Sequence, residues 1–233
     1  MGMHVKALQR SLRKRYGKVR LKLKHIMADL SNYWFLQNRK EKGAPVGISE
    51  CSIRTEFNER NPHALRPSDY DEWTSSGWKK VELPEELWLI SPDRKYLFDI
   101  RWFHYGFVVS ERFLELLLSD STQPFVYREI FIRNRKRIIT EGKYYYLRFY
   151  SDTSNLIDKD RSQLSYNKKH GYISAIKHLS IVEDVPWNVF MISDAVLLDK
   201  LFISESFRQK CLDLKLIGSD ILPAQEAGLA QFF

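Results

Sequence analysis

Hydrophobic and polar residues alternate over short stretches along most of this chain, which is the pattern of β-strands. Residues 31–36 read as a buried strand, and residues 124–151 alternate and break twice, as two or three antiparallel strands would. Further strand-like stretches occupy residues 86–91, 96–103, 107–109, 172–183 and 188–193, and Ile221 and Leu222 are a candidate last strand. Two polar segments interrupt the pattern. Residues 48–80 predict an irregular surface segment, and residues 152–171 predict a long loop or the seam between two halves.

Two stretches change from strand to helix periodicity at the same motif. These are "FVVSERFLELLL" at residues 107–118 and "LFISESFRQKCL" at residues 201–212. Phe113, Leu116 and Leu117 have the spacing of an apolar helix face. The second helix is predicted near residues 205–216, with Gly218 as the left-handed residue that ends it.

The serine in each motif is interpreted as a helix N-cap rather than a nucleophile. A nucleophilic serine usually lies on a glycine-flanked turn, and neither Ser110 nor Ser204 has a flanking glycine. A serine hydroxyl before a helix accepts a hydrogen bond from an unpaired N–H of the first turn. Glu111 and Glu205 follow, and their charge favours the positive end of the helix dipole.

The two motifs match at a constant offset of 94 residues, as in Val109 with Ile203 and Phe113 with Phe207. Two related strand-to-helix modules explain the match, although a common capping pattern can also arise by coincidence. The predicted fold class is therefore α+β, with antiparallel sheets, a few helices and two related modules.

Composition fits a globular chain, with 233 residues, 44% hydrophobic residues and 28% charged residues. The net charge of +8 is concentrated in residues 1–26, which hold nine Lys or Arg and no acidic residue. The remainder holds 28 basic and 29 acidic residues and is close to neutral.

Residues 1–26 have helical periodicity, and three interpretations remain open. A basic amphipathic helix binds nucleic acid or an anionic membrane surface. It can instead pack its apolar face on the domain. Alternatively, it precedes the functional start, because Met27 opens a strand-like stretch where the basic bias ends. A deletion that begins at Met27 distinguishes these alternatives.

No pattern of catalytic, cofactor-binding or metal-binding residues is evident. Cys51 and Cys211 are far apart, and the histidines, among them His104, lack ligand spacing. Carboxylates at residues 69–72 and 158–160 are interpreted as solvated turns, and the basic residues 133–137 as a hairpin tip. The chain has no apolar run of about 18 residues and no secretory signal pattern. We therefore expect no enzyme activity, no cofactor, no membrane span and a cytoplasmic location.

Several motifs occur in an order that is similar to one family. These are "GFVVSERFLELL", "KYYYLRFYSDTSNLIDKDRS", "NVFMIS" and "KLFISESFRQKCLDLKLIGSDI". The chain resembles the immunity proteins of bacterial polymorphic toxin systems, in family eleven, with family forty-three as a near neighbour. The resemblance covers about residues 86–223. Ser206 and Ile221 depart from its usual arginine and phenylalanine.

The resemblance implies an α+β protein that binds and neutralises a cognate toxin in a stable complex. The alternative is a module that binds nucleic acid or a membrane surface through residues 1–26, and the oligomeric state stays open. Expected toxin contacts are Tyr70, Trp73, Trp78 and Tyr166, in the two polar segments. The expected organisation is a basic arm at residues 1–26, a strand with a wrapping segment at 27–85, and the two-module domain at 86–233.

Overall fold

The computed structural model describes residues 32–39, 52–61, 72–74, 78–91, 96–103, 105–134 and 136–228. Backbone contacts separate Met1–Asn32 from Tyr33–Phe233, and the architecture described below is that of Tyr33–Phe233. The basic arm, Tyr70, His104 and Cys51 lie outside the described residues.

The described residues form mainly β structure with two α-helices, α2 (Glu111–Leu118) and α3 (Glu205–Leu214). The short helical turns are η2 (Glu72–Thr74), η3 (Ser154–Leu156) and η4 (Ala224–Glu226). The strands are β1 (Tyr33–Asn38), β2 (Ser52–Arg54), β3 (Trp88–Ile90), β4 (Ile100–Phe103), β5 (Gly106–Ser110), β6 (Phe125–Arg133), β7 (Tyr144–Phe149), β8 (Gln163–Tyr166), β9 (Ile173–His178), β10 (Val189–Phe190), β11 (Leu201–Ser204) and β12 (Ser219–Pro223).

These strands build three sheets. A six-stranded sheet has the order β2-β3-β6-β7-β5-β4, a four-stranded sheet has the order β10-β11-β1-β12, and β8 pairs with β9. All pairs are antiparallel except β3 with β6. The predicted α+β class is confirmed.

The two strand-to-helix modules extend into two four-stranded units of the same design. The order β4-β5-β7-β6 in the first matches β10-β11-β1-β12 in the second. In each unit the serine that precedes the helix lies opposite a tyrosine, with Ser110 opposite Tyr144 and Ser204 opposite Tyr33. The strand order along the chain differs, because β7 follows its helix whereas β1 comes long before α3.

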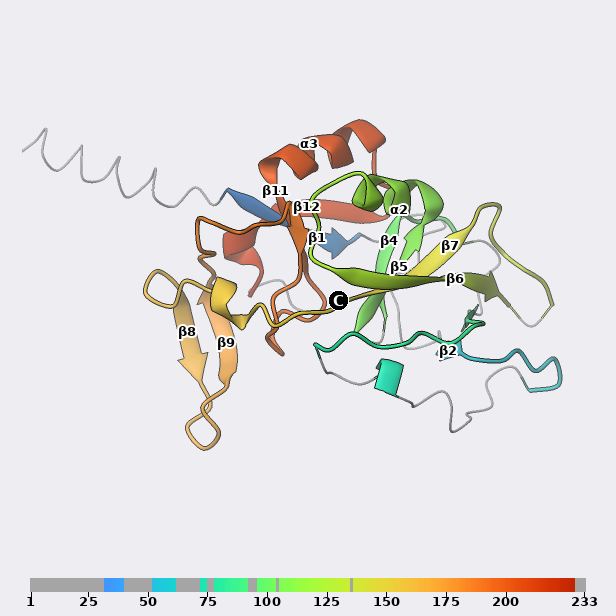
Figure 1. Ribbon diagram of the computed structural model, residues 1–233, viewed down its shortest axis with the longest axis horizontal. Coiled ribbons are helices and arrows are strands. Elements are labelled where there is room, and N and C mark those ends of the chain that lie inside the picture. The colour runs from blue at the N-terminus through green and yellow to red at the C-terminus, as the bar shows by residue number, and fades with distance from the viewer. Residues whose placement is uncertain are drawn as a thin grey trace, which may run out of the picture. The chain divides into compact units, whose positions relative to one another are not determined.

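The helices α2 and α3 lie side by side and bury their apolar faces between the two units (Figure 1). The rings of Phe113 and Phe207 meet edge to face, with centroids 6.3 Å apart. They belong to a central core that also takes Val109 from β5 and Ile203 from β11. Both helices that begin at the serine caps thus pack into one shared core.

The six-stranded and the four-stranded sheet also bury their other faces. Val108 and Tyr146 pack beneath the six-stranded sheet, and Phe35 and Phe202 pack beneath the four-stranded sheet. The strands next to the helices are therefore buried on both faces, which explains why β5 reads as a continuous apolar run rather than an alternation.

The end of α3 differs from the prediction. The helix ends at Leu214, and its left-handed residue is Lys215, with φ of 53°, rather than Gly218. Gly218 also has a positive φ, 77°, but it lies immediately before β12. The glycine therefore shapes the entry to a strand.

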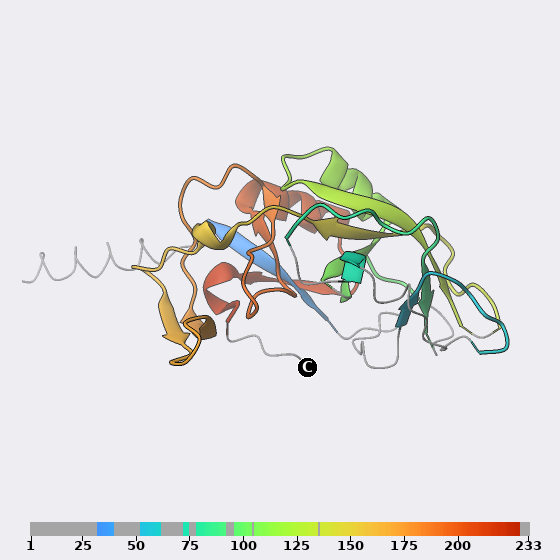
Figure 2. The ribbon, with the colours of Figure 1, turned by 60° about the horizontal axis from the view of Figure 1, so that its bottom comes forward.

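The described parts of the two polar segments contain regular elements that were not predicted. Residues 152–171 contain η3 and β8, so they are not one long loop. The β8–β9 hairpin stands away from α2 in both ribbon views (Figure 2). In the segment 48–80, β2 pairs with β3, and Trp73 is buried, 3% exposed.

Candidate functional site

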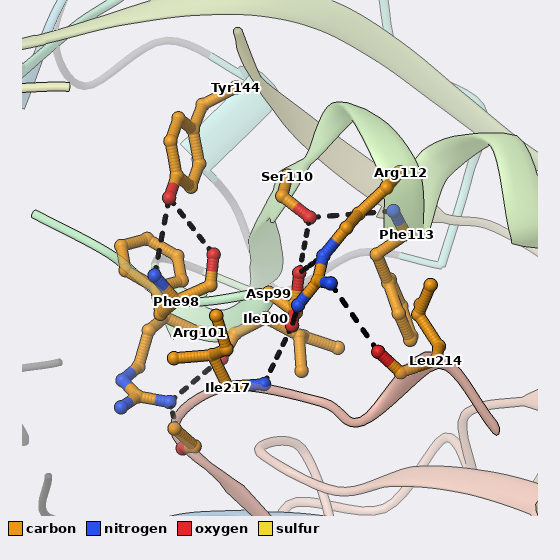
Figure 3. A network of polar contacts seen from close by, with 11 residues as sticks. Phe98, Asp99, Ile100, Arg101, Ser110, Arg112, Phe113, Tyr144, Leu214 and Ile217 are labelled. Atoms are coloured by element: carbon orange, nitrogen blue, oxygen red, sulfur yellow. Dashed lines mark hydrogen bonds and ion pairs between the residues drawn. The ribbon is translucent and has the colours of Figure 1, made fainter. Parts of the chain in front are cut away.

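The most elaborate polar cluster surrounds the cap of α2, and we call it the first cap site: Asp99, Ser110, Arg112 and Ile217 (Figure 3). The Asp99 side chain is 2% exposed. Its carboxylate accepts hydrogen bonds from Ser110 Oγ at 2.7 Å, Arg112 Nε at 2.7 Å and the Ile217 N–H at 2.6 Å. Arg112 Nη2 also donates to Asp99 Oδ2, which makes the ion pair bidentate.

The hydrogen bonds of Ser110 describe a capping group. Its Oγ accepts from the Phe113 N–H at 3.4 Å while it donates to Asp99. The pKa of Arg112 is raised, chiefly by its hydrogen bond to Asp99. The Asp99 carboxylate binds both the Arg112 guanidinium and the Ile217 N–H. It therefore connects the first turn of α2 to the segment that follows α3.

The second cap site has the same plan: Asn188, Ser204, Ser206, Asp120 and Lys210. Ser204 Oγ donates to Asn188 Oδ1 at 2.8 Å and accepts from the Phe207 N–H at 3.3 Å. Asn188 Nδ2 donates to Asp120 at 2.7 Å, and Lys210 Nζ binds the same carboxylate at 2.7 Å. Burial raises the pKa of Asp120, but the hydrogen bonds from Lys210 and Asn188 outweigh burial and lower it.

Two charged side chains of the first cap site are replaced by two neutral side chains in the second. Arg112 of the first module corresponds to Ser206 of the second, and the carboxylate of Asp99 corresponds to the amide of Asn188. Ser206 Oγ lies 3.3 Å from Asn188 Oδ1, where Arg112 meets Asp99 in the first site. Ser206, which stands where the family usually has arginine, thus faces the neutral amide of Asn188 and not a carboxylate.

Each cap site also holds the segment that follows the opposite helix. The Asp99 N–H donates to the Ile217 carbonyl at 3.0 Å, just after α3, and the Asn188 N–H donates to the Ser121 carbonyl at 2.7 Å, just after α2. The sites therefore fasten the two units to each other. The serines are recognisable in the sequence, whereas Asp99 and Asn188, which precede them by 11 and 16 positions, were not predicted.

A recess of about 380 Å³ opens beside the first cap site. The residues that line it include Phe98, Glu111, Arg112, Lys143 and Tyr144. The Tyr144 hydroxyl donates to the Phe98 carbonyl at 3.0 Å and accepts from its N–H at 3.2 Å. Among the described residues, no histidine is hydrogen-bonded to Ser110 or Ser204, so neither hydroxyl is paired with the base that a serine nucleophile requires.

The aromatic residues expected to touch a partner are placed differently from one another. The ring of Trp73 packs edge to face on Tyr146 at 5.8 Å, inside the core beneath the six-stranded sheet. It is unavailable to a partner in this conformation. Trp78 is half-buried, Tyr166 on β8 is 48% exposed, and Tyr70 lies outside the described residues.

Across the part of the chain that the structure describes, no cluster of three or more His, Cys, Asp or Glu could hold a metal ion. Within the same residues no helix is long and apolar enough to cross a membrane. Burial raises the pKa of the Cys211 thiol to about 12, which keeps it protonated and unreactive at neutral pH.

The profile of a family described as Immunity protein 43 matches residues 36–230. This is the family named above as the near neighbour, rather than family eleven. A search of curated proteins finds no match. The matched residues contain both helices, both cap sites and the β8–β9 hairpin, and they exclude the basic arm.

Proposed function

The chain belongs to the Immunity protein 43 family, and from that premise we propose that it neutralises a cognate bacterial toxin by binding it. The observation that carries the proposal is the family match, which spans residues 36–230 and therefore both modules. The protein acts in a polymorphic toxin system and protects the producing cell or its siblings during bacterial competition.

The proposed mechanism is a stable one-to-one complex without catalysis. A rigid binding surface loses little conformational entropy on association, which favours tight binding. The two cap sites and the shared core supply such rigidity, because each cap site ties one unit to the segment that follows the helix of the other. The complex covers the active site of the toxin or locks the toxin in an inactive form.

Among the contact residues expected from the sequence, Tyr166 and Trp78 remain proposed contacts. Tyr166 is exposed on the β8–β9 hairpin, whose turn also carries Lys168 and Lys169. The Asn167 side chain accepts from the N–H groups of Lys169 and His170 at 2.9 and 3.0 Å, so the turn is held in one shape. Aromatic anchors on a preorganised loop are typical of binding hot spots.

The location follows from the same proposal. An inhibitor that protects against a toxin inside the cell must be present there, so we place the protein in the cytoplasm. We also propose that the basic arm, residues 1–26, is dispensable for protection, since the family match begins at residue 36. A deletion that begins at Met27 should protect as well as the full chain.

Co-expression with the product of the adjacent toxin reading frame tests the function. Growth should be restored, and the two proteins should elute together at equimolar ratio in size-exclusion chromatography. A titration of toxin activity with purified protein should end at one equivalent. Neither rescue nor a complex would refute the proposal, and full inactivation by substoichiometric amounts would refute the non-catalytic mechanism.

A further inference from the structure

The strand β6 is flanked on both sides along only part of its length. Its residues Phe125–Ile130 pair with β7 on one side. On the other side, β3 pairs only with Phe131–Arg133. Among the residues that the structure describes, no strand pairs with the first half of β6 on that side, so it is an edge of the six-stranded sheet, and edges of this kind can pair with another chain.

The backbone direction along this edge is fixed by hydrogen bonds at both ends of the strand. The Pro124 carbonyl accepts from the Tyr150 N–H at 3.0 Å, so even-numbered residues direct their polar groups toward β7. The Phe131 N–H donates to the Leu87 carbonyl at 2.9 Å, so odd-numbered residues direct theirs the opposite way. The register with β7 is continuous between these points. The N–H and C=O groups of Tyr127 and Glu129 therefore point away from β7, and no described residue is hydrogen-bonded to them.

The segment 78–87 follows this edge without pairing with it, and we call it the strap (Figure 1 and Figure 2). Its two ends are tied. The Trp78 carbonyl accepts from the Ser151 N–H at 2.8 Å, and the Leu87 carbonyl accepts from the Phe131 N–H at 2.9 Å. Between the ties, β6 covers about 20 Å, at roughly 3.3 Å per residue, whereas ten extended residues can reach about 30 Å. The strap is thus long enough to bow away from β6.

A groove of about 640 Å³ separates the strap from the strand edge. It is lined by residues 80–83 of the strap and residues 125–128 of β6. Val81, Leu83 and Val126 give it apolar walls, while Lys80, Glu82 and Arg128 place charges of both signs around it. Tyr127 is 45% exposed beside it. This combination of unpaired backbone groups and apolar walls suits an extended peptide with apolar side chains at alternate positions.

We propose that an extended segment of the toxin, about five or six residues long, adds to β6 in this groove as an extra strand. The inference rests on the proposed function and names the surface that carries it. The groove also lies beside the end of the segment 48–80, where the Trp78 carbonyl accepts a hydrogen bond from Ser151, the residue before the segment 152–171. A loop or tail fits better than the sheet of a second copy of this chain, because β3 at one end and the Trp78 tie at the other limit the pairing length.

Amide hydrogen exchange with purified toxin tests the inference on the unaltered protein. In the free protein, the amides of Tyr127 and Glu129 should exchange freely, whereas the amide of Arg128 is protected by β7. One equivalent of toxin should slow exchange at Tyr127 and Glu129 at least tenfold. Binding that leaves these two amides unchanged would overturn the inference while the proposed function stands, and no binding at all would refute the proposed function itself. Protection already present without toxin, whether or not it depends on protein concentration, would indicate a segment of this chain or a second copy and would also overturn it.

A matched pair of variants adds a second readout. Tyr127→Pro removes an N–H that β7 does not use, and an edge strand tolerates proline at such a position. Tyr127→Ala removes the same side chain and keeps the N–H. Both variants should unfold at similar temperatures, and Tyr127→Pro should bind toxin at least tenfold more weakly than Tyr127→Ala. Equal affinities of two folded variants would contradict strand addition, and if the proline variant is unfolded, the exchange experiment decides.

Discussion

Removal of the Asp99 carboxylate should destabilise the protein more than removal of either cap serine. Asp99→Ala removes the acceptor of the Ile217 N–H and the ion-pair partner of Arg112, whose guanidinium keeps its hydrogen bond to the Leu214 carbonyl at 3.3 Å. Breaking a buried ion pair costs about 3–5 kcal/mol. The Arg112 side chain is 40% exposed and can be hydrated, so we expect the lower half of that range, about 3–4 kcal/mol. For a chain of this size, each kcal/mol lowers Tm by roughly 2–4 °C.

Urea unfolding followed by tryptophan fluorescence measures the loss, with Asp160→Ala on the exposed surface as the control, expected within about 0.5 kcal/mol of the parent. A second comparison transfers the neutral chemistry of the second cap site. Asp99→Asn should cost less when Arg112→Ser is also present, with a coupling energy of about 1–3 kcal/mol. A loss below about 1 kcal/mol for Asp99→Ala, or the absence of coupling, would refute the view that the Asp99–Arg112 ion pair stabilises the first cap site.

Three further outcomes are expected. Ser204→Ala should lower the free energy of unfolding by about 1 kcal/mol in urea titrations and leave growth protection intact; a loss of protection without a loss of stability would contradict the capping role. The raised pKa of Cys211, about 12, means that the unfolded thiol ionises first, so stability should fall as pH rises above about 9, and the decline should be shallower in Cys211→Ala, measured by unfolding at several pH values. Gly106→Ala would place a methyl group 2.5 Å from the Leu147 carbonyl, so it should lower Tm, whereas Gly142→Ala, which meets no atom within 4 Å, should not.

The helix starts could be predicted because a cap is a local device. A strand, a serine and an acidic residue before an apolar helix face are all visible within a few positions of sequence. The structure places Ser110 and Ser204 at these positions, with their hydroxyls on the third N–H of each helix. The residues that bind the same hydroxyls were missed, because Asp99 and Asn188 lie at unequal distances before them and no constant offset pairs the two.

The equivalence of the other strands in the two units could not be predicted from the sequence, because these strands follow one another in a different order along the chain. The strands β1 and β7 occupy equivalent places and read "YWFL" and "YYYL", but one precedes its helix and the other follows it, so a search at one offset cannot align both. β8 was missed for a different reason. Three of its four residues are exposed, and a strand with a single half-buried side chain has no alternation to detect. The unpaired edge of β6 depends on where β3 begins to pair with it, which only the tertiary structure determines.

The position of β1 has a consequence for synthesis of the chain. Its partners β11 and β12 are made about 170 and 185 residues after it, and a ribosome that adds about 5–20 residues per second needs roughly 10–35 s to supply them. During that interval Phe35 and Leu36, which are buried in the finished protein, have no neighbouring strand to pair with. The six-stranded sheet, whose strands all precede residue 150, can form first and serve as a template on which the nascent chain closes the four-stranded sheet last.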